Sequence, residues 1–237
     1  MVQVSRRTGF TGSALIDLLT RLTELDVRPS RQSFADRLGQ WLGWTDAIAL
    51  SSALGGAAAA KEAKGVKGVK GASAGDPASA EEAQCARVRS ASAAAIAEDA
   101  RAAALAPTPA DFAPYRRRYV ARQQAMATSI EALRARLRET LAARSPAMAR
   151  LAEIDTVMAQ VLDAQEHRLL ATVPGLLEKH FRRLRQAHAP SDDTTTEIQP
   201  DTAWLDAFCK DMHSVWLAEL ELRLQPVEGL LEALRAR

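Results

Sequence analysis

Apolar residues recur at helical spacing along most of the chain. Leucines three and four residues apart, from Leu15 to Leu25, predict a first amphipathic helix, which ends before Pro29. A second predicted helix starts near Arg31, and a third runs through Ile48 and Leu50. We therefore expect a small N-terminal module of three helices over residues 1–54.

Residues 55–80 interrupt this pattern. They consist mainly of glycine, alanine, serine and lysine, with no apolar side chain larger than valine. Such a segment cannot bury enough surface to offset its chain entropy, so it predicts a flexible, basic linker.

Long helical seams fill the rest of the chain, residues 81–237. One seam alternates steps of four and three residues, as a coiled coil does; it comprises Tyr119, Gln123, Met126, Ile130, Leu133, Leu137 and Leu141. The pattern predicts long helices at about 114–143, 145–188 and 201–237. Alanine, leucine, arginine and glutamate dominate the composition, which favours helix over sheet. The expected fold is all-α, with long antiparallel helices in a bundle or coiled coil.

Prolines mark the places where these helices stop or bend. Ser145 followed by Pro146 is a helix-start signal, but it leaves open whether the chain reverses there or only kinks. Pro174 predicts a kink, or a break at which Thr172 caps a new segment. Pro226 predicts a bend or a break in the last helix.

The small net charge of +2 hides an uneven distribution. Residues 114–188 contain 14 basic and 7 acidic side chains, whereas residues 189–237 contain 4 basic and 10 acidic ones. The two blocks could attract each other inside one bundle, or each could attract a partner.

Two cysteines, Cys85 and Cys209, form no disulfide framework and suit a reducing compartment. The N-terminus lacks the apolar core of a signal peptide, and no apolar run is long enough to span a bilayer. We therefore expect a cytoplasmic protein without membrane insertion.

No sequence motif indicates an enzyme or a cofactor. Cys209 and His213 share a helix face, but two residues do not make a metal site, so we expect neither a metal nor a cofactor. No nucleophile elbow or phosphate loop is present. An active site assembled by oligomerisation stays open.

Arginines gather on the long helices, beside aromatic residues. Such side chains could follow a phosphate backbone, although a solvated face or pairing with the acidic C-terminal helix explains them better. The candidate nucleic-acid-binding residues are Arg116, Arg117, Arg118, Arg122, Arg182, Arg183 and Arg185, with Arg134 and Arg138 nearby.

Trp41 and Trp44 lie three residues apart in the N-terminal module. Residue statistics favour core positions for side chains of this size, but a module of about 50 residues is small to bury two indoles. An exposed indole would be a hot spot for a protein partner, so both are candidate partner-binding residues.

Four segments resemble a bacterial helical family of unknown function: "RQSFADRLGQWLGWTDAIALSSAL", "YRRRYVARQQAM", "LLATVPGLLEKHFRRLR" and "WLDAFCKDMHSVWLAELELRLQPVEGLLEAL". That family resembles an accessory protein of type III Zorya anti-phage systems, which are built around an ion-driven motor in the inner membrane. The resemblance implies a cytosolic partner of this motor and carries no catalytic residues.

These observations lead to two hypotheses. The first is a non-enzymatic accessory or effector protein that couples a defence machine to a downstream target through protein contacts. The alternative is a nucleic-acid-binding effector, with DNA as its candidate partner, that uses the basic helices of residues 115–185. The long seams also suggest homo-oligomers.

Overall fold

The computed structural model describes residues 14–24, 32–55, 77–104, 111–188 and 203–236. These residues form eight helices, and no strand occurs among them. The helices are α1 (Ala14–Thr23), α2 (Phe34–Trp41), α3 (Trp44–Gly55), α4 (Pro77–Ala104), α5 (Ala113–Arg144), α6 (Pro146–Leu170), α7 (Val173–Ala187) and α8 (Ala203–Arg235). The predicted all-α fold is confirmed.

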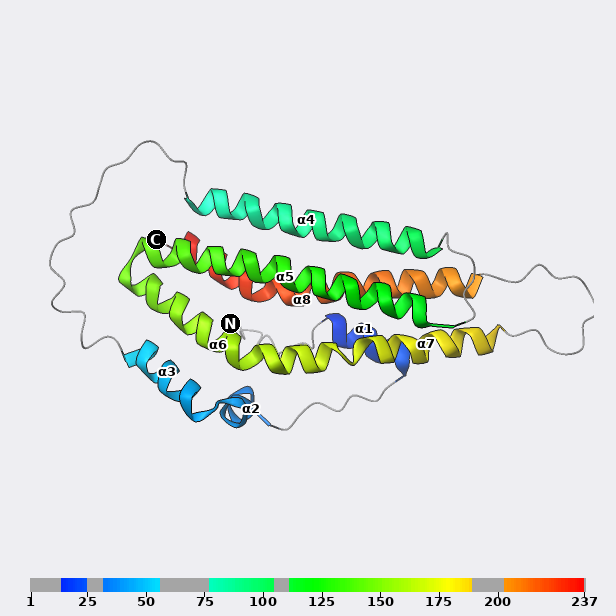
Figure 1. The fold of residues 1–237 in the computed structure, drawn as a ribbon, viewed down its shortest axis with the longest axis horizontal. Helices are drawn as coiled ribbons and strands as arrows, with labels where there is room; N and C mark the ends of the chain where they lie inside the picture. Colours follow the sequence, from blue (N-terminus) through cyan, green and yellow to red (C-terminus); the bar gives the residue numbers. More distant parts are fainter. Residues whose placement is uncertain (1–13, 25–31, 56–76, 105–110, 189–202, 237) are drawn as a thin grey trace, which may run out of the picture.

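Four long segments run along the long axis of an elongated bundle (Figure 1). The chain runs out along α4, back along α5, out again along α6 and α7, and back along α8. Neighbours in sequence are therefore antiparallel, whereas α5 and α8 run parallel, with Tyr119 beside Trp216 and Arg144 beside Leu234. This central pair lies between α4 on one side and α6–α7 on the other.

The predicted seam of α5 is the core of the bundle. All seven of its residues, from Tyr119 to Leu141, are buried, and α8 contributes a matching buried face that includes Trp216 and Leu224. Five aromatic rings tie the ends of α5, α7 and α8 together: Phe112, Tyr115, Phe181, Trp204 and Phe208.

The turn at Ser145 reverses the chain, which settles the alternative that the sequence left open. The Ser145 side chain accepts a hydrogen bond from the Met148 amide, and α6 then packs back along α5. Pro146 occupies the first position of α6, where a backbone N–H would have no partner within the helix. The missing N–H of proline therefore costs nothing at this position.

The second long segment is broken, not continuous, because α6 ends at Leu170 and α7 begins at Val173. The expected Thr172 cap does not form, since its hydroxyl donates to the Leu169 carbonyl instead. Of the bend or break expected at Pro226, the break does not occur, because α8 continues through this residue. Buried apolar residues on both sides, such as Leu224 and Val227, hold the helix in place.

The N-terminal helices contact the bundle. α1 packs against α7 and α8 through Leu15 and Leu22, and α3 packs against α6. The division into a module, a linker and a bundle stays a prediction, because residues 56–76 lie outside the described residues. Residues 77–80, which we expected to be linker, already belong to α4.

Candidate interaction surface

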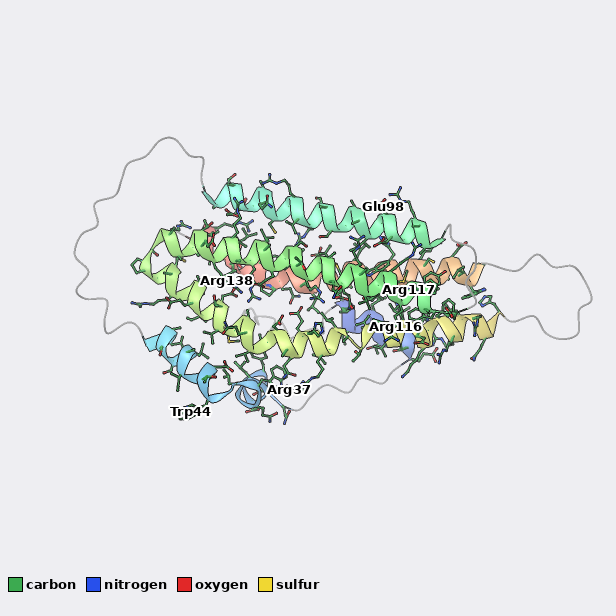
Figure 2. All side chains as sticks on the ribbon, viewed as in Figure 1. Arg37, Trp44, Glu98, Arg116, Arg117 and Arg138 are labelled. Carbon is green, nitrogen blue, oxygen red and sulfur yellow. The ribbon has the colours of Figure 1, made fainter. Side chains whose placement is uncertain are left out.

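The α2–α3 surface, which we define as Trp41, Trp44 and Ile48, is an apolar surface at the junction of helices α2 and α3. Trp44 exposes 83% of its surface and Ile48 exposes 52%. These two residues are four apart on α3, so their side chains lie on one face. Trp44 points away from the molecule at its edge (Figure 2), whereas Trp41 at the end of α2 is half-buried.

Local hydrogen bonds place Trp44 at the start of its helix. Ser33 and Asp36 form a capping box that begins α2. The amide of Gly43 donates to the Asp46 carboxylate, at 3.1 Å, and this bond anchors the first turn of α3. The short turn between the two helices therefore sets the direction of the indole.

The opposite face of α3 attaches it to the bundle. Ala53 is buried, and with Ala49 and Ser52 it faces Thr156 and Val157 of α6. Ala53 follows Trp44 by nine positions, which is two and a half helical turns. The helix therefore docks through small side chains and turns its largest apolar side chain toward solvent.

Most of the predicted nucleic-acid-binding arginines already have partners. Arg122 forms an ion pair with Asp99 of α4, and Arg182 pairs with Glu178 one turn away. Arg183 binds Glu24, next to α1, and Arg185 lies over the Phe181 ring. These guanidinium groups make contacts within the protein, but the carboxylates they bind lie on α4, on α7 and next to α1, and not on the acidic C-terminal helix that was the expected partner.

Arg116 and Arg117 differ from this set. Both are exposed at the start of α5, where Figure 2 shows them near α7. Arg118 is half-buried on the same turn. The structure therefore does not gather the seven predicted arginines into one free cationic surface.

Arg134 and Arg138 converge on a single carboxylate, Asp155 of α6. Arg134 Nε donates to Asp155 Oδ2 at 2.8 Å and Arg138 Nε donates to the same oxygen at 2.7 Å. Burial raises the pKa of Asp155, but the hydrogen bonds and charges of the two guanidinium groups outweigh it and lower the pKa overall. This triad joins α5 to α6 near their shared turn.

A cavity of about 680 Å³ lies between α5, α6 and α8. Arg134, Arg138 and Arg223 line it, and all three already bind carboxylates. The charges around this cavity therefore serve the packing of the three helices.

Cys209 and His213 share a face of α8, as predicted, and line a small cavity beside α4. Burial raises the pKa of the Cys209 thiol to about 11, so the residue is a poor nucleophile and a poor metal ligand at neutral pH. Over the described residues, no three histidine, cysteine or acidic side chains come close enough together to hold a metal ion.

His180 is buried on α7 and pairs with α8, not with the nearby Glu178. Its Nε2 lies 2.7 Å from Asp211 Oδ2, and its Nδ1 lies 3.3 Å from Arg183. Arg183 in turn binds Glu24. This series of contacts, from Asp211 through His180 and Arg183 to Glu24, connects α8, α7 and the residue that follows α1.

A buried polar network that the sequence analysis missed centres on Glu219 of α8, which is 0% exposed. Glu219 accepts hydrogen bonds from Tyr119, from Gln123 and from Arg223. Arg223 also binds Glu166 of α6. The signal was present: Gln123 occupies a seam position, and Glu219 lies three residues after Trp216 on the apolar face of α8.

No helix among the described residues is both long enough and apolar enough to cross a lipid bilayer. Neither a curated protein nor a solved structure matches the chain. One family model does match, over residues 1–236, and its description is "Protein of unknown function (DUF3348)". Because the match covers almost the entire sequence, the chain belongs to this family.

Proposed function

We propose that this protein is a non-enzymatic, cytoplasmic helical adaptor that binds a partner protein through the α2–α3 surface. The exposure of Trp44, 83% on a helix otherwise docked to the bundle, carries the proposal. Exposing so large an apolar side chain costs free energy, which a partner would recover by covering it.

The geometry favours a partner with an apolar groove. Trp44 and Ile48 stand one turn apart on one helix face, which is the spacing that groove-binding helices use for their anchors. The flanking Asp36 and Asp46 would lie at the rim of the contact, where a basic partner surface fits best.

The identity of the partner rests on the sequence resemblance alone. The resemblance to an accessory protein of type III Zorya anti-phage systems suggests a cytoplasmic part of their ion-driven motor complex. In this proposal the protein couples the motor to a downstream target.

The test is binding of the purified full-length chain to the purified cytoplasmic part of a type III Zorya motor complex. We expect Trp44→Ala to weaken binding at least tenfold, since hot-spot truncations cost about 2 kcal/mol or more. Val120→Ala, which trims an exposed apolar residue on α5, is the matched control and should bind like the wild type. Equal binding by all three proteins would refute the α2–α3 surface, and no binding by any of them would refute the partner.

The nucleic-acid alternative has less support. Arg122, Arg182 and Arg183 are engaged by carboxylates. Exposed arginines without a described partner, Arg116 and Arg117, are the observation that favours it. Two such charges predict weak, salt-sensitive attraction to phosphate and no sequence-specific site.

A further inference from the structure

α4 forms an outer layer of the bundle. It packs against α5 and α8, on the side of this central pair away from α6–α7 (Figure 1). The aromatic cluster and the Glu219 network join α5, α7 and α8 without any residue of α4. The centre of the protein therefore does not depend on α4.

The apolar contact made by α4 is small. Its buried apolar residues, within the part whose side chains are described, are Ala78, Cys85, Ile96 and Ala103, of which Ile96 alone is large. By contrast, α5 buries two tyrosines, a methionine and several leucines. A helix with so little apolar area gains little from burial.

Ion pairs spread along the helix add to the contact made by its small side chains. Near its start, Glu81 binds Arg136 at 2.9 Å and Glu82 binds Arg235. In its middle, Arg89 binds Glu221 and Glu228 of α8.

Near the end of α4, a further ion pair joins Asp99 to Arg122 of α5 at 2.6 Å. Every one of these pairs includes a side chain that is at least one-fifth exposed. Partly exposed pairs of this kind are screened by salt.

Packing between α4 and α8 is also incomplete. A cavity of about 410 Å³ lies beside Cys85 and Leu231, and another of about 380 Å³ lies beside Ala97 and Cys209. Atoms that line a gap lose dispersion contacts on one side. Both cysteines of the chain therefore lie along this interface and are shielded by it.

We propose that α4 is a releasable strap, held to the bundle by small side chains and partly exposed ion pairs, whose departure uncovers a face of α8. Screening these ion pairs with salt, or removing their carboxylates, weakens the attachment, while the aromatic cluster and the Glu219 network stay in place. Release exposes Cys209 and Leu231 of α8.

Thiol labelling of the full-length protein tests this. With an aromatic disulfide reagent, we expect the labelling rates of Cys85 and Cys209 to rise several-fold between about 50 mM and about 1 M NaCl, where the screening length falls to about 3 Å. The double variant Glu82→Gln/Glu228→Gln, which removes partners of Arg235 and Arg89, should label rapidly even at low salt. Glu178→Gln removes an ion pair confined to α7 and should label like the wild type.

Hydrogen exchange followed by mass spectrometry separates release of α4 from global unfolding. We expect peptides from residues 77–104 to lose protection in high salt, while those from α5 and α8 keep theirs. Labelling rates that change neither with salt nor in the charge variants would overturn the proposal. Equal loss of protection in α4, α5 and α8 would overturn it too, and this readout on the wild type holds even if the double variant fails to fold.

Discussion

The hydroxyl of Tyr119 donates a hydrogen bond of 2.7 Å to the Glu219 carboxylate, in the centre of the bundle. Burial, followed by the negative charge of Glu219, raises the pKa of Tyr119 well above its ordinary value. The phenol therefore stays protonated and remains a donor to the buried carboxylate. This bond fixes the register between two helices that run parallel and are separated by about 100 residues of sequence.

Tyr119→Phe should destabilise the protein by about 1.5–3 kcal/mol, the usual range for a hydrogen bond to a charged group. Chemical denaturation measures this free energy of unfolding. Tyr115→Phe is the matched control, because its buried hydroxyl meets the Cys209 thiol, a weak hydrogen-bond partner, and not a carboxylate, so it should cost less than about 1 kcal/mol. Equal losses for the two variants would contradict a special role for Glu219.

Asp155→Asn should cost about 3 kcal/mol, because it leaves two largely buried guanidinium groups without their carboxylate. The lowered pKa of Asp155 also has a pH consequence. Its contribution is complete above the ordinary value of 3.8 and is lost as the pH falls through the lower folded value. The free energies of unfolding of wild type and Asp155→Asn should therefore differ at neutral pH and converge as the pH falls below 3.8, while the exposed Asp163→Asn control should follow the wild type throughout.

Ser145→Ala should destabilise the protein by about 1 kcal/mol, since it removes the side chain that caps α6. Thr172→Ala tests the specificity of this effect, because Thr172 occupies the first position before α7 without capping it. We expect a smaller loss there, measured as a shift in thermal unfolding. A larger loss for Thr172→Ala would show that the break between α6 and α7, not the turn, limits stability.

Trp44→Ala should leave the free energy of unfolding within about 0.5 kcal/mol of the wild type, since the indole is exposed. Trp216→Ala, by contrast, removes a buried ring that stacks on Tyr119 and should cost about 3–5 kcal/mol. Thermal or chemical denaturation distinguishes the two. Unfolding of the Trp44 variant would restore the core interpretation of this residue.

Fluorescence anisotropy with labelled duplex DNA should show weak binding at low salt that disappears near physiological ionic strength. The double variant Arg116→Gln/Arg117→Gln should remove most of what is seen, and Arg182→Gln should remove little, because Arg182 is paired with Glu178. Tight binding at physiological salt that depends on all seven candidate arginines would instead support the nucleic-acid-binding effector.

Much of the helical architecture follows from local sequence. The alternating seam from Tyr119 to Leu141 predicted α5 to within a residue at each end, because side chains spaced by three and four positions share one helix face. Ser145 and Pro146 predicted the next helix start through capping, which needs only neighbouring atoms. These features depend on contacts within one turn of helix, so the sequence contains them.

The sequence does not determine which helix each amphipathic face contacts. The spacing of apolar residues does not predict that α5 lies parallel to α8. It also does not predict that Tyr119 donates a hydrogen bond to Glu219, or that Arg122 pairs with Asp99. Those choices join residues far apart in the chain. They depend on how four long segments pack together and on which carboxylates that packing brings within reach.

The sequence by itself therefore determined an all-α chain with long amphipathic helices, their main starts and stops, and the buried stripe of α5. Only the tertiary structure decided that the chain reverses at Ser145, that Arg122, Arg182 and Arg183 bind carboxylates, and that Trp44 faces solvent. The physical reason is one of range. Periodicity and capping act over a few residues, whereas burial and ion pairing depend on the three-dimensional neighbours that packing supplies.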